Sequence, residues 1–528
     1  MTNGIPIVAG GNVKVKKNVD ICLISRAGFD IIYSMNRTGF DSEKYLSVQT
    51  EKILERINDF GGKLYLEFGG KLFDDFHASR VLPGFAPDNK IKMLSKLKDR
   101  AEIVIVINAA DIAKNKVRAD LGITYDVDVL RLIDVFRGYG LYVGSVVLSQ
   151  FEKTNEPAVK FKKKLEKLGL KVYQHYRING YPNNVPLIIS DDGYGKNEYV
   201  ETTRDLVVVT APGPGSGKMA TCLSQLYHDF KRGIKAGYAK YETFPVWNLP
   251  LKHPVNVAYE AATADLNDVN MIDPWHLAAY GVTTVNYNRD VEIFPVLNTL
   301  FEKLMGTSPY KSPTDMGVNM AGFAISDDEI CCKASKQEII RRYFKALEDE
   351  RRNNLEPHES EKILLLMNSL GITVEDRAVY VACVKKQKAV KVPVSAIELS
   401  DGTVITGKTS ELFESQSAMI LNALKHLAHI PDDVKLLLPE RIIPITELKV
   451  NYLKSQTPRL HIDETLIALS SSCSENENAA RAIEQLKNLN GAEVHTSVIL
   501  PHIDVKMFRK LGINQTSSPV YEEKIPKL

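Results

Sequence analysis

Short apolar runs alternate with amphipathic stretches along the chain from about residue 60 onward. The apolar runs "KLYLEF", "AEIVIVI" and "LYVGSVVLS" are separated by "NKIKMLSKL" and "DVLRLIDVFRGYG", whose apolar residues recur with helical spacing. Apolar residues at consecutive positions are typical of strands that are buried on both faces. The order strand, helix, strand therefore predicts a Rossmann-like α/β fold with a mostly parallel sheet over residues 35–326.

The pattern changes on both sides of this region. Residues 1–34 have a glycine-rich start, a KVKK cluster and weak periodicity, so we expect translation to begin naturally at Met35 and this leader to lie outside the native fold. Three consecutive stretches with helical spacing predict a helical domain over residues 327–390. The hairpin signal "AIELSDGTVITG", a helix and a late strand predict a second, smaller α/β domain over residues 391–528.

Composition narrows the class of protein. Hydrophobic residues make up 44% and charged residues 25% of the chain, which is typical of a soluble globular protein, and the length of 528 residues indicates several domains. The formal net charge of +2 gives no overall field that would attract nucleic acid or an anionic membrane. The six cysteines have no CxxC spacing and no apolar run is long enough to cross a membrane, so we expect a cytoplasmic protein without a zinc site. A homo-oligomer is compatible with this reading.

A glycine-rich turn follows the apolar strand 207–210 in the segment "VVVTAPGPGSGKMATCLSQL". In a phosphate-binding loop, backbone N–H groups at the start of a helix surround the phosphate, and a Lys neutralises its outer oxygens. The segment matches this pattern at Gly217 and Lys218, but Pro212 replaces the first glycine and Met219 replaces the magnesium-binding Ser or Thr. The predicted phosphate contacts are Gly213, Gly215, Ser216, Gly217 and Lys218.

A plain strand-to-helix turn is the alternative, because glycine and proline also serve tight turns. We favour anion binding, since this turn leaves N–H groups without helical partners beside a cation. In doubly wound sheets, ligands bind outside the carboxyl ends of the strands. Gly70 and Lys71 follow the first predicted strand at that edge, so we include them among the expected cofactor contacts.

The segment 241–325 is dense in Pro, Asn, Asp, His and aromatic residues, which few scaffolds need. Acids and histidines gather in it, but their spacing is loose and no HExxH occurs, so a zinc protease is not expected. In a phosphoryl-transfer site, an acid either holds magnesium or acts as the base. We predict this role for Asp265 or Asp273.

Two further residue types in this segment can contribute chemistry. Arg289 is predicted to bind a phosphate or carboxylate through its planar fork, and a surface pair with Asp290 or Glu292 is the alternative. His253 and His276 are candidates for an acid–base group, and a hydrogen-bonded loop residue is the alternative for each.

Several long phrases in the chain resemble an uncharacterised bacterial family whose members have about 500 residues and are sometimes labelled ATP-dependent proteases. The phrases are "YLEFGGK", "ASRVLPGF", "VVVTAPGPGSGKMATCLSQLYHDF", "YAKYETFPVWNLPLKHPVN", "AYEAATADLNDVNMIDPWH" and "SPTDMGVNM". The resemblance runs from about Met35 to the C-terminus. It implies a multidomain cytoplasmic protein with α/β, helical and α/β parts. It supplies no reaction and no catalytic residue.

Our leading hypothesis is a cytoplasmic enzyme that binds a phosphorylated small molecule, such as ATP or another nucleotide with magnesium, and carries out phosphoryl transfer. One alternative is a non-catalytic nucleotide-binding sensor or scaffold, which Met219 favours. Another is a metal-independent sugar-phosphate or cofactor enzyme with His253 or His276 as its acid–base group.

Overall fold

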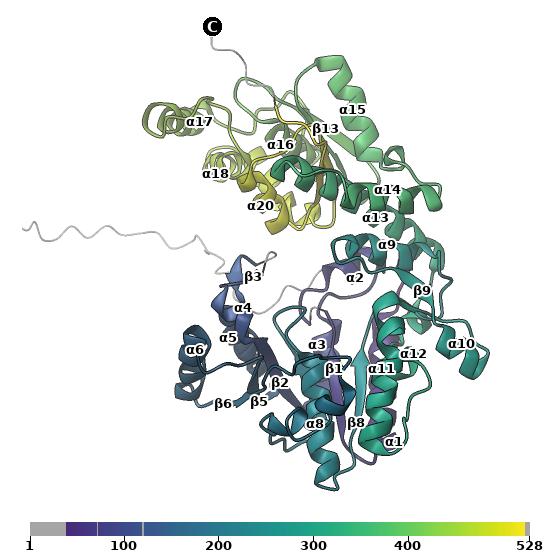
Figure 1. Cartoon of the computed structure of the whole chain (residues 1–528). Coiled ribbons are helices and arrows are strands. Elements are labelled where there is room, and N and C mark those ends of the chain that lie inside the picture. Colours follow the sequence, from purple (N-terminus) through teal and green to yellow (C-terminus); the bar gives the residue numbers. More distant parts are fainter. Residues whose placement is uncertain (1–37, 71, 119–120, 523–528) are drawn as a thin grey trace, which may run out of the picture. The chain divides into compact units, whose positions relative to one another are not determined.

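The computed structural model describes residues 38–70, 72–118 and 121–522. Lys71 and the predicted leader, residues 1–34, lie outside the described residues. The N-terminal part contains a seven-stranded sheet in the order β11-β8-β1-β7-β2-β5-β6, and every neighbouring pair of strands is parallel (Figure 1). Its strands are β1 (Leu64–Phe68), β2 (Ala101–Asn108), β5 (Tyr142–Ser149), β6 (Lys171–Gln174), β7 (Leu206–Thr210), β8 (Gly237–Tyr241) and β11 (Gly317–Val318). The predicted parallel sheet is confirmed.

Helices cover both faces of this sheet, and successive residues of each strand face opposite sides. Leu64 and Leu66 of β1 belong to one apolar core, whereas Tyr65 between them belongs to another. The first core is formed with α1 (Ser42–Asp59), α3 (Asn89–Lys96), α5 (Tyr125–Gly138) and α6 (Glu156–Lys167). The second is formed with α8 (Lys218–Lys231) and α11 (Asn288–Met305), which pack against each other (Figure 1).

The order of the strands fixes where a ligand can bind. The chain leaves β1 and β2 through helices on the first face, but it leaves β7 through α8 on the second face. Because β7 lies between β1 and β2, the connections after neighbouring strands run to opposite sides of the sheet. Such a switch point, at the carboxyl ends of the strands, is where open α/β sheets bind their ligands. The residues that follow β7 form the glycine-rich turn.

The polar segment between β8 and β11 folds into short elements. A two-stranded antiparallel ladder forms from β9 (Asn270–Ile272) and β10 (Val285–Tyr287). The helices of this segment are α9 (Pro254–Ala262), α10 (Pro274–Tyr280), α11 and α12 (Pro313–Met316). Earlier short elements are α2 (Phe76–Val81), α4 (Ala109–Ala113), α7 (Val185–Ile188) and a ladder of β3 (Val117–Arg118) with β4 (Ile123–Thr124).

Three helices follow: α13 (Asp328–Asn353), α14 (Glu359–Ser369) and α15 (Ala378–Val390). The long helix α13 packs against α2, α9 and α14 around a third apolar core. Inside this region, Glu338 is 1% exposed, and its carboxylate accepts hydrogen bonds from Arg80, Arg341 and Arg342. Burial alone would raise the pKa of Glu338, but these guanidinium groups hold it well below its usual range. The carboxylate is therefore the centre of a buried ionic network.

The C-terminal part is a smaller α/β domain, as predicted. Its four-stranded sheet has the order β13-β12-β14-β15, in which β12 is antiparallel to both neighbours and β14 is parallel to β15. The strands are β12 (Val394–Glu398), β13 (Val404–Lys408), β14 (Glu493–Thr496) and β15 (Asn514–Ser517). The helices are α16 (Ser415–Leu427), α17 (Pro439–Glu447), α18 (Ile462–Ser472), α19 (Glu477–Ile483) and α20 (His502–Lys510).

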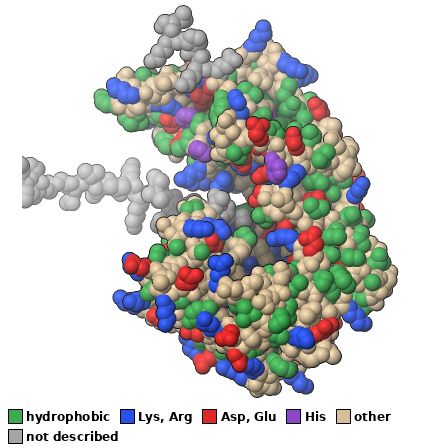
Figure 2. Space-filling model, in the orientation of Figure 1, with side chains coloured by type: hydrophobic (Ala, Val, Ile, Leu, Met, Phe, Trp, Pro, Cys, Tyr) green, Lys and Arg blue, Asp and Glu red, His purple; other side chains and the backbone are tan. Residues whose placement is uncertain are grey.

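The surface carries charges of both signs. Figure 2 shows Lys and Arg side chains interspersed with Asp and Glu over the visible face. Among the described residues, no helix combines the length and the apolar character that crossing a membrane requires.

Candidate functional site

The glycine loop, residues 211–217, joins the end of β7 to the start of α8. Gly215 and Gly217 have φ values of +73° and +91°, in the left-handed region that favours glycine. At Gly213 the reason is space, because an added Cβ would overlap the hydroxyl of Tyr125. Each of these three positions therefore has a physical requirement for glycine.

Side chains from neighbouring strand ends hold the carbonyl groups of this loop. Ser149 Oγ donates a hydrogen bond of 2.6 Å to the carbonyl of Ser216, and Asn108 Nδ2 lies 3.4 Å from the carbonyl of Gly215. Ser216 Oγ closes the loop internally by donating to the carbonyl of Gly213 at 2.7 Å. These hydrogen bonds fix the loop conformation through its carbonyl groups and do not use its backbone N–H groups.

The amide N–H groups from Gly215 to Ala220 have no acceptor among the residues that the structure describes. The first backbone bond of α8 runs from the N–H of Thr221 to the carbonyl of Gly217. Unpaired amides at the start of a 14-residue helix also carry the positive end of its dipole. The arrangement is suited to binding an anion.

Lys218 adds a positive charge at the same place. Its side chain is half-buried and makes no hydrogen bond or ion pair with the rest of the described chain. Burial raises the pKa of Cys222 well above its ordinary value, the charge of Glu67 raises it further, and the charge of Lys218 lowers it. Lys218 and Glu67 therefore both lie close to Cys222, beside the loop.

A buried ionic cluster lies at the carboxyl ends of β1 and β8. Glu67 accepts a hydrogen bond of 2.8 Å from the hydroxyl of Tyr238. The Lys240 ammonium pairs with Glu242 at 2.7 Å and with Asp290. Burial alone would lower the pKa of Lys240, but the carboxylates of Asp290, Glu242 and Glu67 hold it above its usual value.

Glu242 is the group of this cluster that suits acid–base chemistry. Burial raises the pKa of Glu242 to about 7, although the charge of Lys240 acts in the opposite direction. A carboxyl group with a pKa near the working pH can both give and take a proton. Sequence reasoning missed Lys240 and Glu242, and the signal available for them was a Lys and a Glu at the end of an apolar strand.

Arg289 connects to this cluster from the start of α11. Its guanidinium binds both oxygens of Asp268, at 2.6 Å and 2.8 Å, while its own side chain is 59% exposed. Burial raises the pKa of Asp268, and the charges of Arg289 and Lys240 lower it while that of Asp290 raises it. Arg289 is thus paired with Asp268 of a preceding loop. The contact of Arg289 with a phosphate stays a prediction.

Asp273 and His276 make hydrogen bonds within the segment between β8 and β11. Asp273 is fully buried, caps α10 by accepting from the N–H groups of Trp275 and His276, and accepts from Thr314 through its second oxygen. The Nδ1 atom of His276 lies 2.9 Å from the hydroxyl of Ser312. Both oxygens of Asp273 therefore have protein partners, and its part in chemistry stays a prediction that this geometry does not favour.

Asp265 and Gly70 complete the predicted set. Asp265 is exposed, and its charge contributes to the raised pKa of Glu359, behind burial as the main cause. Gly70 follows β1 with φ +71°, and the ammonium of Lys90, which pairs with Asp75 at 2.7 Å, lies near its Cα. Lys71 lies outside the described residues.

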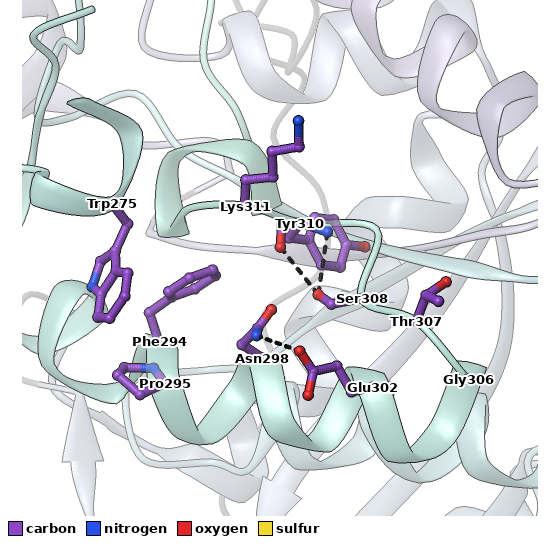
Figure 3. Close-up of a pocket in the computed structure, with 10 residues that line it drawn as sticks. All are labelled: Trp275, Phe294, Pro295, Asn298, Glu302, Gly306, Thr307, Ser308, Tyr310 and Lys311. Carbon is purple, nitrogen blue, oxygen red and sulfur yellow. Dashed lines mark hydrogen bonds between the residues drawn. The ribbon is translucent and has the colours of Figure 1, made fainter. Parts of the chain in front are cut away.

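A cavity of about 630 Å³ lies along α11 and the loop that follows it. Figure 3 shows Trp275 and Phe294 at one end of this cavity and Thr307 toward the other, with Glu302 and Asn298 between them. None of the residues lining it belongs to the glycine loop or to the ionic cluster of Glu67, Lys240, Glu242 and Asp290. The cavity and the glycine loop are therefore separate features.

Comparison with known proteins gives a consistent relationship over nearly the whole chain. The model for "Domain of unknown function DUF1846, N-terminal" matches residues 38–371, and the model for "Domain of unknown function DUF1846, C-terminal" matches residues 375–525. UPF0371 protein cu0538 of Corynebacterium urealyticum is 60% identical over 486 residues, which cover 92% of this chain and 98% of that protein. UPF0371 protein DIP2346 of Corynebacterium diphtheriae is 59% identical over 489 residues, covering 93% and 98%. A UPF0371 protein of Streptococcus sanguinis is 58% identical over 489 residues, covering 92% and 99%. The chain belongs to the bacterial DUF1846 (UPF0371) family, in agreement with the resemblance seen in its sequence.

Proposed function

We propose that this protein binds the phosphate groups of a nucleotide, or of a related phosphorylated small molecule, at the glycine loop. The observation that carries the proposal is the run of amides from Gly215 to Ala220 beside the cation of Lys218, none of which has a partner within the described part of the chain. The loop lies at the switch point of the sheet, where ligands of this fold class bind. A plain turn would need neither the free donors nor the cation.

The proposed reaction is phosphoryl transfer, in which the protein mainly positions the phosphate and neutralises its charge. The loop amides and Lys218 would bind the phosphate oxygens, and Glu242 would exchange a proton with the attacking group. Magnesium requires oxygen ligands. The hydroxyls of Ser216 and Thr221 are engaged with loop carbonyls, so carboxylates such as that of Glu67 would supply them.

A nucleotide-binding sensor without catalysis is the second candidate. It is favoured by Met219, which stands where phosphate-binding loops place the hydroxyl that binds magnesium. Binding without turnover is the expected behaviour of such a protein. Release of inorganic phosphate from a bound nucleotide in the presence of magnesium separates the two candidates, because the sensor predicts none.

Isothermal titration with ATP, ADP, GTP and pyrophosphate, each with and without magnesium, tests the site. Lys218→Ala removes one charge-assisted contact and should weaken binding by about 1.5 to 3 kcal/mol. The control is Lys235→Ala, which removes an exposed lysine beyond the other end of α8. Equal affinity of wild type and Lys218→Ala for every phosphate ligand, or loss of affinity in the control alone, would refute the proposal.

A further inference from the structure

Three side chains that commonly bind metals meet where α9 and α13 begin. His253 precedes α9, whereas Asp328 and Cys332 lie one turn apart in the first turns of α13. The Nε2 atom of His253 is 3.3 Å from Asp328 Oδ2 and 3.4 Å from Cys332 Sγ. Cys332 Sγ is 3.7 Å from Asp328 Oδ2, so the three groups form a compact triangle.

The size of this triangle matches the coordination sphere of one zinc-type ion. A tetrahedral ion with bonds of about 2.0 Å to nitrogen and oxygen and about 2.3 Å to sulfur separates its ligand atoms by about 3.3 to 3.6 Å. The observed separations of 3.3, 3.4 and 3.7 Å lie around that range. Only small side-chain movements would therefore be needed to close three ligands around an ion.

The chemistry and exposure of the three groups narrow the choice of ion. A thiolate with an imidazole and one carboxylate suits Zn²⁺ and its substitute Co²⁺, whereas Mg²⁺ and Ca²⁺ prefer oxygen ligands throughout. The His253 side chain is 10% exposed, but that of Asp328 is 59% exposed. A fourth position is thus accessible to water on the Asp328 side.

We propose that His253, Asp328 and Cys332 form a binding site for a zinc-type divalent cation. The ion would join the start of α9 to the start of α13, two helices that already pack together. The expectation of no zinc site rested on short-range spacing. Spacing does not reveal this site, because 75 positions separate His253 from Asp328. The proposal does not depend on the glycine loop.

Binding has a defined proton balance. In the structure, Nδ1 of His253 lies 3.3 Å from the N–H of Val255 and serves as the cap of α9. Coordination through Nε2 places the ring proton on Nδ1, so this cap bond is lost. The S–H bond of Cys332 breaks as the metal–sulfur bond forms, and that proton passes to solvent. The capping bond given up is a long one, and the first residue of α9, Pro254, has no N–H to satisfy.

The test titrates the full-length protein, freed of metal by a chelator, with Co²⁺ and then Zn²⁺. Wild type should bind one equivalent of Co²⁺ with a thiolate-to-cobalt charge-transfer band in the near ultraviolet, and Zn²⁺ should displace it. Cys332→Ser should abolish the band, and His253→Asn should weaken binding about tenfold or more. Asn is a good helix cap, so the second variant retains the start of α9.

The control is Cys473→Ser, which alters another half-buried cysteine, in the C-terminal domain. It should bind Co²⁺ with the wild-type band and affinity. Zn²⁺ should raise the melting temperature of wild type and of this control, but not that of Cys332→Ser. Absence of saturable Co²⁺ binding to wild type, or a band that persists in Cys332→Ser, would show that the triangle is only a hydrogen-bonded group with a neighbouring thiol.

Discussion

Gly215 differs from Gly213 and Gly217 in the space available for a side chain. Among the described residues, no atom lies within 4 Å of a Cβ built at Gly215, whereas Cβ atoms at Gly213 and Gly217 would meet Tyr125 and Ser149. Under the proposed function, a side chain at residue 215 would therefore contact the bound phosphate group rather than another described part of the protein. The φ value of +73° adds a backbone cost for any residue with a Cβ.

Replacing Gly215 by Ala should cost about 1 to 2 kcal/mol of folding stability, the penalty for a left-handed residue with a Cβ. The control is the same substitution at Gly402, in the hairpin between β12 and β13. Gly402 has a φ of +83°, and among the described residues no atom lies within 4 Å of a Cβ built there. Urea denaturation should show similar losses for both variants. If wild type binds a nucleotide as proposed, calorimetric titration with that nucleotide should show weakened affinity for Gly215→Ala alone, and equal affinities would place the ligand elsewhere.

The sequence was sufficient to predict the glycine loop as a candidate site, because the residues of the loop are consecutive along the chain. Lys218 and the loop glycines are recognisable from their order along the chain, since a strand, a glycine-rich turn and a helix are consecutive. Lys240 and Glu242 became visible only in the structure, because their importance depends on burial and on Asp290, which lies 50 positions away from Lys240. For Asp273 the acid was noticed, but its hydrogen bonds to Trp275, His276 and Thr314 were not predictable from spacing.

At the scale of elements, α13 carries a buried carboxylate to which three arginines bind. Glu338 lies on its inner face, where Arg341 and Arg342 of the same helix and Arg80 of α2 bind its carboxylate. Removing one member of a buried ion pair leaves the others without a counter-charge, which is costly in a medium that solvates charge poorly. The helix therefore depends on one carboxylate to pack against α2.

Glu338→Gln should lower the free energy of unfolding by about 3 to 5 kcal/mol, the cost of breaking a buried ion pair from one side. Glu329→Gln, an exposed position in the first turn of the same helix, is the control and should change stability by less than about 0.5 kcal/mol. Chemical denaturation followed by circular dichroism measures both. Similar small losses in the two variants would mean that the arginines are solvated well enough without Glu338.

The alternation of apolar and amphipathic stretches was sufficient to predict a parallel sheet with helices on both faces, because burial on two sides leaves a clear mark on strand composition. The order of the strands in the sheet was not predictable from these apolar runs. The insertion of β7 between β1 and β2 depends on which face each connecting helix takes, and this is decided by packing between segments far apart in the sequence. The ladder of β9 and β10 escaped prediction because its strands have only three residues each.

At the scale of the whole molecule, stability should depend on pH through histidines that are buried in the neutral form. His495 is fully buried between Thr516 and Ser518, and burial, aided by the charge of Arg377, lowers its pKa to about 3. At pH values between the ordinary histidine pKa of about 6.5 and this lowered pKa, His495 binds a proton in the unfolded chain but not in the folded chain. The contribution of His495 therefore makes the protein less stable as the pH falls through this window.

Lowering the pH from 7 to 5 should cost wild type about 2 kcal/mol more than it costs His495→Gln, because each pKa unit corresponds to about 1.4 kcal/mol. The difference between the proteins isolates this residue from groups of opposite effect such as Glu242, whose pKa is raised to about 7. Urea denaturation at the two pH values measures it. Parallel pH profiles for wild type and His495→Gln would contradict the prediction.

The carboxylate of Glu493 in β14 binds two arginines, one from each of the two segments that the family models match, residues 38–371 and 375–525. Arg341 binds one oxygen at 2.6 Å, and the fully buried Arg377 binds the other at 2.7 Å. We therefore expect substitutions at these positions in the two segments to be linked. A lineage that neutralised residue 493 would leave the buried Arg377 beside Arg341, whose remaining carboxylate partner is Glu338, so we expect it to change an arginine as well. Coordinated substitution at these three positions is the evolutionary trace that such an arrangement should leave.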